Sequence, residues 1–109
     1  MSGVSIDPGA LNRRLVLEAP NETADGGGGV IRGYEAFATL WASVEPVAAR
    51  EDLVAAQPGA TVTHRIVVRY SADITTRHRF RDGGRVFRIL TIRERDKRWL
   101  DIQAEERIG

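Results

Sequence analysis

Two histidines and a pair of adjacent acids on a predicted helix are the side chains of this 109-residue chain that we consider for catalysis or metal binding. His64 and His78 are isolated, each within a separate predicted strand, and neither has a carboxylate at the spacing of a metal ligand. Glu51 and Asp52 are neighbours on a predicted helix, where adjacent side chains point about 100° apart, so a solvated helix face is their ordinary role. The chain has no cysteine and no GxSxG or HExxH motif. These residues predict no enzyme, no metal site and no cofactor.

A run of four glycines, Gly26–Gly29, is the next feature that could bind a ligand. A phosphate-binding loop would continue into GK[ST] between a strand and a helix, and this run does not. Consecutive glycines give the backbone maximal freedom. The stretch 20–33 therefore predicts a long flexible loop that becomes ordered only in an assembly, or else the tip of an extended hairpin.

Arginine supplies 15 of the 16 basic residues, and its forked guanidinium suits carboxylates and phosphates. Residues 1–60 carry four arginines and eight acids, whereas residues 61–109 carry twelve basic residues and seven acids. Much of this arginine excess is explained by a genome that favours arginine codons and by strand faces that are exposed to solvent. The sharper interpretation is a surface that meets nucleic acid or an acidic protein rim. The asymmetry also suits subunits that join head to tail.

The stretch 40–70 organises the predicted fold. Residues 40–45 alternate apolar and polar side chains, as does the β-branched run 61–70, so each predicts a strand with one buried face. Between two prolines, the alanine-rich run over 46–58 predicts a short helix. Trp41 lies opposite Leu40 and Ala42, where it could cap a barrel or lie at a subunit interface, although a core position is favoured.

The remaining segments add short strands separated by turns, with Asp82, Gly83 and Gly84 closing one hairpin. The strands are predicted at 11–19, 34–45, 62–70, 77–81, 85–93 and 99–105. The sum predicts one mainly β domain over 1–109, with a mobile N-terminal arm over 1–10. The predicted architecture of this domain is a small antiparallel β-barrel or sandwich of about six strands, with one short α-helix and a long glycine-rich loop. No apolar run approaches the roughly 20 residues of a membrane helix, so we expect a soluble intracellular protein and no membrane partner.

In order along the chain, the segments GALNRRLVLEAP, WASVEP, VTHRIVVRYSADIT, RFRDGGRVFRIL and RWLDIQAEE resemble the phage head–tail joining family. These are the head-closure, or stopper, proteins of long-tailed phages and of related prophage or gene-transfer particles. The resemblance covers residues 9–106. The glycine-rich segment 25–29 departs from the shared pattern, because loop length and sequence vary there.

The resemblance implies a small β-barrel subunit that assembles into a ring, a hexamer or dodecamer. The portal and adaptor rings lie above it, and tail terminator or tail tube proteins lie below. The ring closes the exit channel for packaged double-stranded DNA without reading its sequence, and it provides the tail docking surface. No catalysis and no cofactor are implied. The protein would reside in the host cytoplasm during assembly and then in the virion, at the head–tail connector.

Under this resemblance, two regions are candidates for plugging the channel or touching DNA, and each could also be an ordinary solvated loop. The candidate residues are Asp25, Gly26, Gly27, Gly28, Gly29 and Arg32 in one region, and Arg77, Arg79 and Arg81 in the other. The candidate residues for contact between subunits are Trp41, Arg50, Glu51 and Leu53.

Two other classes of function stay open at this stage. A monomeric β-barrel with basic strand faces would suit single-stranded nucleic acid, but aromatic residues for a stacking platform make up only 6% of the chain. The other class is an enzyme whose site the sequence disguises, for which no substrate suggests itself.

Overall fold

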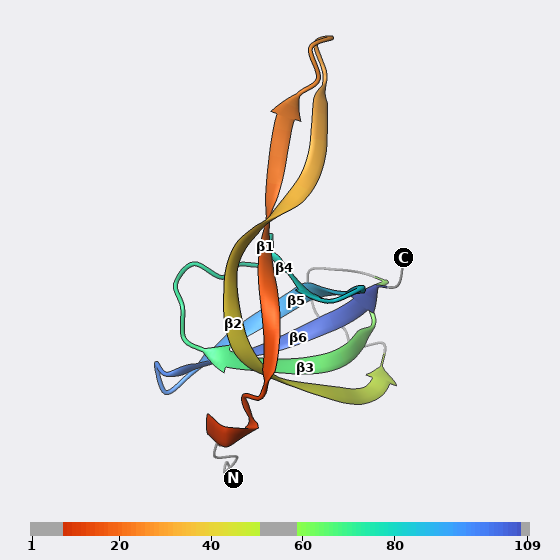
Figure 1. The fold of residues 1–109 in the computed structure, drawn as a ribbon. Coiled ribbons are helices and arrows are strands. Elements are labelled where there is room, and N and C mark those ends of the chain that lie inside the picture. Colours follow the sequence, from red (N-terminus) through yellow and green to blue (C-terminus); the bar gives the residue numbers. More distant parts are fainter. Residues whose placement is uncertain (1–7, 51–58, 108–109) are drawn as a thin grey trace.

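The computed structural model describes residues 8–50 and 59–107, and six antiparallel strands dominate it. They form a closed barrel in the order β1-β2-β3-β6-β5-β4 (Figure 1). The elements are η1 (Pro8–Ala10), β1 (Arg13–Ala24), β2 (Val30–Arg50), β3 (Val62–Arg69), β4 (Arg79–Asp82), β5 (Arg85–Arg95) and β6 (Trp99–Arg107). The mainly β, six-stranded prediction is confirmed. No helix within the described residues is long and apolar enough to cross a membrane.

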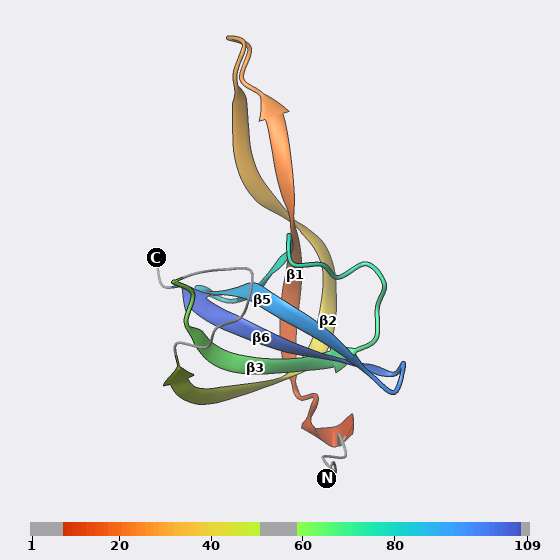
Figure 2. The same ribbon diagram turned by 180° about the vertical axis from the view of Figure 1, so that it is seen from behind.

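β1 and β2 continue beyond the barrel as a two-stranded ribbon. Their pairing runs from Ala19 opposite Glu35 to Ala24 opposite Val30, so that only residues 25–29 connect the strands. The ribbon tip and η1 lie at opposite ends of the molecule (Figures 1 and 2), whose extents are 56 × 28 × 25 Å. The predicted flexible loop over 20–33 is therefore wrong, and the alternative of an extended hairpin is right. Cross-strand pairing continues to the last residue before the glycine run.

The helix predicted over 46–58 is wrong in its first part. Residues 46–50 belong to β2, where Pro46 pairs with His64 and Arg50 pairs with Val62. Strand pairing outweighs the helix propensity of the alanines there, as tertiary context often does. A register shift between Pro46 and Arg50 accommodates the proline. The remainder, 51–58, lies outside the described residues, as do residues 1–7 of the predicted N-terminal arm.

The barrel interior is filled by apolar side chains that alternate along the strands, as the sequence pattern predicts. The buried set is Leu15, Leu17, Ala42, Ile66, Val68, Ile74, Phe80, Phe87, Ile89, Leu100, Ile102 and Ala104. Trp41 is not among them, since 56% of its surface is exposed. The favoured core position for Trp41 is therefore wrong. A single sheet closed on itself buries only its inner face, and Trp41 lies on the outer one.

The barrel closes where β1 pairs with β4. This seam consists of three residue pairs, with Leu17 opposite Phe80 at its centre. Both side chains are buried in the interior, whereas their neighbours on each strand point outward. A register shift between Leu17 and Glu18 on the β2 side of β1 marks the point where the barrel ends and the ribbon begins.

Phe80→Ala should lower the free energy of unfolding by about 3–5 kcal/mol, because it leaves a cavity at the shortest seam of the barrel. Urea denaturation followed by circular dichroism measures this change. Phe37→Ala is the matched control, because Phe37 is exposed on β2, and it should cost about 0.5 kcal/mol or less. Equal losses in the two variants would contradict the assignment of Phe80 to the closure of the barrel.

Candidate functional site

The tip of the ribbon is a closed turn built around one carboxylate. Asp25 Oδ1 accepts hydrogen bonds from the amides of Gly27 (2.7 Å) and Gly29 (3.0 Å), and the Asp25 amide donates to the Gly29 carbonyl (3.1 Å). The backbone bonds from Gly27 and Gly29 lower the pKa of Asp25. Gly26 and Gly28 have φ of 85° and 89°, the left-handed region that favours glycine. Gly26 and Gly28 are thus required by the geometry of the turn.

Arg32 lies on the ribbon below the tip, opposite Glu22 in the β1–β2 register. Its Nε is 3.4 Å from Glu22 Oε2, and its side chain is 81% exposed. An ion pair this exposed contributes little to stability. Arg32 is therefore accessible to a partner that approaches the ribbon.

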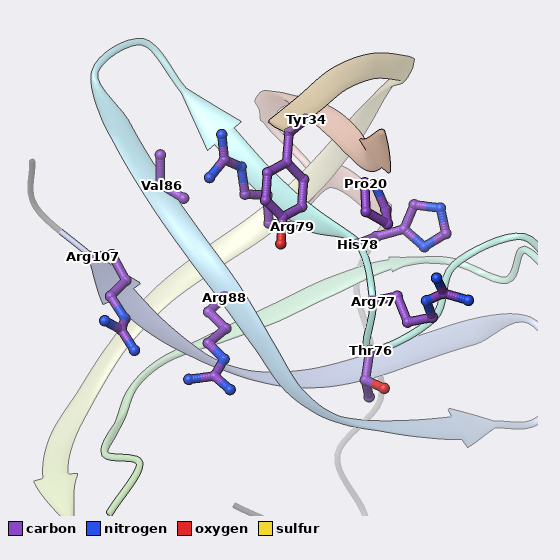
Figure 3. A pocket seen from close by; sticks show the side chains of 9 residues that line it. All are labelled: Pro20, Tyr34, Thr76, Arg77, His78, Arg79, Val86, Arg88 and Arg107. Carbon is purple, nitrogen blue, oxygen red and sulfur yellow. The ribbon is translucent and has the colours of Figure 1, made fainter. Parts of the chain in front are cut away.

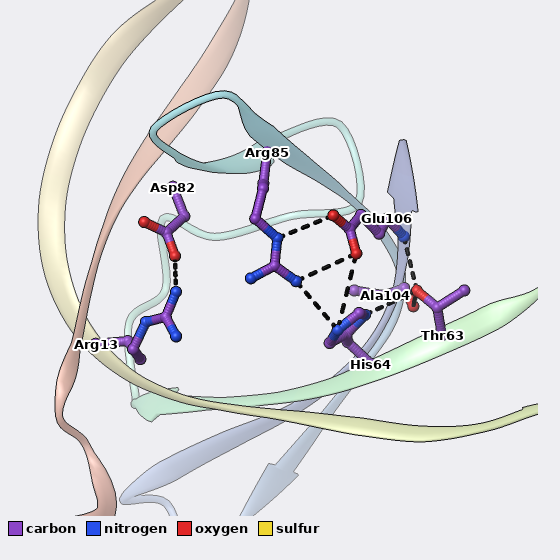
Figure 4. A network of polar contacts seen from close by, with 7 residues as sticks. All are labelled: Arg13, Thr63, His64, Asp82, Arg85, Ala104 and Glu106. Atoms are coloured by element: carbon purple, nitrogen blue, oxygen red, sulfur yellow. Dashed lines mark hydrogen bonds and ion pairs between the residues drawn. The ribbon is translucent and has the colours of Figure 1, made fainter. Parts of the chain in front are cut away.

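Glu18 joins β1 to β4 on the outer side of the seam. Although only 7% exposed, its carboxylate accepts hydrogen bonds from Arg79 Nε (2.6 Å) and Arg81 Nε (2.8 Å). Burial alone would raise the pKa of Glu18, but the bonds from Arg81 and Arg79 outweigh it and lower the pKa below 4.5. An ion pair between Arg13 and Asp82 links β1 to the far end of β4 (Figure 4). Two of the predicted DNA-facing arginines are thus engaged in closing the barrel.

A basic pocket of about 550 Å³ opens beside this seam, at the base of the ribbon (Figure 3). It is lined by residues of both ribbon strands, the β3–β4 connection and strands β4, β5 and β6. The lining residues are Pro20, Tyr34, Thr76, Arg77, His78, Arg79, Val86, Arg88 and Arg107. Four are arginines and none is an acid, so the basic pocket suits an anion.

The arginines of the basic pocket differ in whether they already form ion pairs within the protein. Arg79 is bound to Glu18, and its guanidinium carbon lies 3.8 Å from the centre of the Tyr34 ring. Arg107 Nε is 3.4 Å from Glu105. Within residues 8–50 and 59–107, neither Arg77 nor Arg88 forms an ion pair. These two are the cations available to a ligand.

The two regions predicted to face DNA are not brought together. Asp25 and the glycines form the ribbon tip, whereas Arg77 and Arg79 line the basic pocket at the ribbon base. Arg81 lies on the same strand as Arg79, next to the basic pocket. The predicted site residues did not include Tyr34, Arg88 and Arg107. A signal for Arg88 was present, since a two-residue turn at Gly83-Gly84 places it directly opposite Arg79.

An apolar line of exposed side chains runs along β2. It consists of Val30, Ile31, Tyr34, Phe37, Trp41 and Val47, all exposed. Phe37 has no partner in the β1 register, because Leu17 pairs with Ala38 and Glu18 with Ala36. The guanidinium carbon of Arg14 lies 6.0 Å from the Trp41 ring centre. Such a surface marks contact with another molecule.

Of the predicted interface residues, the structure describes Trp41 fully. Arg50 ends β2 and pairs with Val62, and its side chain is not among those described. Glu51 and Leu53 lie outside the described residues. Trp41 thus belongs to the apolar line, and its place at a subunit interface stays a prediction.

His64 is a buried core residue whose ring centre lies 5.0 Å from that of Phe87. Figure 4 shows its polar contacts. Arg85 Nη2 donates to its Nε2 (3.4 Å), so the proton lies on Nδ1, which donates to Thr63 Oγ1 (2.9 Å). Thr63 Oγ1 also accepts from the Glu106 amide (2.8 Å) and donates to the Ala104 carbonyl (3.5 Å). Burial is the main cause that lowers the pKa of His64, with Glu106 opposing and Arg85 adding to it. This network stabilises the barrel.

Across the described part of the chain, no group of three or more histidines, cysteines or acids is arranged to hold a metal ion. His78 instead bonds within its own turn, where Thr75 donates its amide to Nδ1 at 3.2 Å. The basic pocket therefore suits an anion, and the apolar line suits an apolar surface of another molecule.

A family model described as phage head completion protein matches residues 6–107. Among solved structures, a chain from the virion of a native gene transfer agent particle is 34% identical, with a TM-score of 0.63. That match covers 90% of this chain and 96% of the other. A Shigella flexneri 2a protein, known from a solution structure, is 29% identical with a TM-score of 0.72, over 93% of this chain and 96% of that one. No curated protein matches the chain.

Glu18→Gln should lower the free energy of unfolding at pH 7 by about 1–3 kcal/mol, because it removes the charge that Arg79 and Arg81 contact. The pKa of Glu18 is lower in the folded chain than the unfolded value of 4.5. Its stabilisation is therefore present above pH 4.5 and is lost as the pH falls through the folded pKa. Urea denaturation from pH 7 to about pH 3 measures this loss, which the variant should lack. Glu22→Gln, in an exposed pair, is the control that should change little.

His64 gives a second, separate pH window. Because its pKa is lowered from 6.5 on folding, the unfolded chain binds a proton there more readily than the folded one. The stability is therefore full above pH 6.5 and falls as the pH drops below that value toward the folded pKa. His64→Gln should flatten this dependence between pH 7 and the Glu18 window, as measured by thermal unfolding. An unchanged slope in the variant, or an equal flattening in His78→Gln, would contradict the role of His64.

Proposed function

Because the chain belongs to the phage head completion protein family, we propose that it forms a ring at the head–tail junction. The ring closes the DNA exit channel after packaging and provides the surface on which the tail docks. The family match over residues 6–107 is the observation that carries this proposal. The likeness to a chain of a gene transfer agent virion supports a structural virion component rather than an enzyme.

The ribbon and the apolar line supply the surfaces that a ring subunit needs. A two-stranded ribbon is marginally stable by itself in water, and this one exposes Val30 (55%) and Ile31 (61%) near its tip. Adjacent residues of a strand point to opposite faces, so neighbouring proteins on both faces of the ribbon would bury both side chains. A ring also requires two different complementary surfaces on each subunit. The apolar line on β2 supports one of them, with Trp41 near the barrel end.

Contacts with packaged DNA would go to phosphates and would not read sequence. Among the candidate arginines, Arg32 and Arg77 are the better placed, since Glu18 already binds Arg79 and Arg81. The ribbon tip, residues 25–29, is the element that reaches farthest from the barrel (Figure 1). We assign it the role of entering the channel or the adjoining ring.

The proposed partners follow from this position. Six or twelve copies form the ring, with the portal and adaptor rings on the head side and tail terminator or tail tube proteins on the other. The subunits are made in the host cytoplasm and become part of the virion. No cofactor takes part.

One observation favours a second candidate, a monomeric barrel that binds single-stranded nucleic acid. Tyr34, Phe37 and Trp41 are all exposed on β2, and arginines lie over two of these rings. Exposed aromatic rings beside arginines form a stacking platform for bases. The aromatic content of 6% argues against such a platform, but composition does not show how many of the rings are exposed.

Recruitment to the head tests the proposed function. The purified protein is mixed with the adaptor–portal complex from the same gene cluster, and the mass is measured by light scattering. We expect a fixed multiple of subunits to join the complex. The double variant Val30→Ser/Ile31→Ser should fold normally but weaken recruitment at least tenfold, because each buried aliphatic side chain contributes about 1.5–3 kcal/mol.

Tyr70→Ser is the matched control, since Tyr70 is exposed but lies outside the apolar line, and it should be recruited like the wild type. A monomer that ignores the complex and instead binds oligonucleotides, with a steep loss of affinity on adding salt, would overturn the ring and favour the second candidate.

A further inference from the structure

We propose that the basic pocket binds an acidic peptide segment of a neighbouring protein in the head–tail joint. This inference rests on the function proposed above and names a partner chemistry for one of its contacts. The carboxylates would be held by Arg77 and Arg88, and an adjacent apolar side chain would lie against Tyr34, Pro20 and Val86.

The charge around the basic pocket is incompletely balanced. Arg88 lies directly opposite Arg79 in the β4–β5 register, and like charges in that arrangement repel. On its other side Arg88 is opposite Glu105. Glu105, however, accepts a hydrogen bond from the Thr61 amide (3.1 Å) and contacts Arg107 (3.4 Å), and forms no ion pair with Arg88. A carboxylate entering the basic pocket would supply the missing counter-charge.

Figure 3 shows donors on two sides of the basic pocket: Arg88 and Arg107 extend from β5 and β6, and Arg77 extends from the β3–β4 connection with its guanidinium turned away from Arg88. A segment that carries two carboxylates could therefore be bound on both sides. Guanidinium groups bind carboxylates through two parallel hydrogen bonds. The hydroxyl of Thr76 is a further polar group in the lining.

The shape favours a peptide over duplex DNA. The basic pocket is concave, and its volume of about 550 Å³ falls in the range of small-ligand sites, roughly 300–1,000 Å³. A duplex presents a convex row of phosphates, only one of which could enter. The ring of Tyr34, held against Arg79 at 3.8 Å, and the side chains of Pro20 and Val86 form apolar walls. These walls suit a peptide in which an acid is followed by an apolar residue.

Occupation of the basic pocket would also orient the ribbon. Pro20 and Tyr34 are paired with each other at the ribbon base, whereas Arg88 and Arg107 belong to the barrel. A bound segment would touch both parts and hold the ribbon at a fixed angle to the barrel. A neighbouring subunit could in this way set the direction of the ribbon tip.

A titration of the whole protein tests the inference, with amide chemical shifts read by NMR. The probe is a short, capped peptide of alternating glutamate and leucine, and the matched probe has glutamine in place of glutamate. We expect the glutamate peptide to bind and to shift the amides of Arg77, Arg79 and Arg88, and the glutamine peptide to bind at least tenfold more weakly.

Arg88→Gln should weaken binding of the glutamate peptide by about tenfold or more, as expected for a lost charge-assisted hydrogen bond. Its thermal midpoint should stay near that of the wild type, because Arg88 is exposed and forms no ion pair with Glu105. Arg93→Gln is the control: Arg93 is an exposed arginine on the same strand, outside the basic pocket, and its loss should leave binding unchanged.

Equal weakening in Arg88→Gln and Arg93→Gln would overturn the inference, since it would mean that the peptide is attracted only by net charge. Tighter binding of a short DNA duplex at the same amides would overturn it in favour of a phosphate site. Normal recruitment by the adaptor–portal complex together with no peptide binding would contradict this inference and leave the proposed function standing. Peptide binding in the basic pocket without recruitment by the adaptor–portal complex would instead contradict the proposed function.

Discussion

The double ion pair of Glu18 with Arg79 and Arg81 is the interaction on which the rest of the structure depends. It lies over a seam of three residue pairs, where Leu17 and Phe80 fill the inside. Without the carboxylate, the guanidinium groups of Arg79 and Arg81 would lie side by side on the same face of β4 with no counter-charge. With it, Arg79 is also held against Tyr34. One buried acid thereby closes the barrel and positions one wall of the basic pocket.

The ribbon is the second consequence of that seam. β4 is only four residues long, so β1 loses its partner on that side just where the register shift at Leu17/Glu18 occurs. Beyond this point β1 and β2 have only each other, and their outer side chains remain exposed. A barrel closed by every strand has no free edge, but the ribbon has two. The surfaces available for assembly are therefore concentrated on the ribbon and along β2.

These features describe a protein that acts by contact. Its buried titratable groups, Glu18 and His64, are bound into networks that hold the barrel together. Its accessible groups are arginines, exposed aromatic rings and the aliphatic residues of the apolar line. Membership of the phage head completion family gives such a surface a purpose, since a subunit at a junction must bind different neighbours on different sides.

The sequence by itself determined the six strands, the inward face of the strands that alternate clearly, and the family, because alternation and segment order are local properties of the chain. The two-residue turn at Gly83-Gly84 sets Arg79 opposite Arg88, although this pairing was not predicted. Only the tertiary structure decided that Trp41 is exposed, that residues 46–50 extend β2, and that Glu18 binds Arg79 and Arg81. Each of these depends on which strand lies alongside. Pairing between segments some 60 residues apart is set by closure of the whole barrel, and no local pattern encodes it.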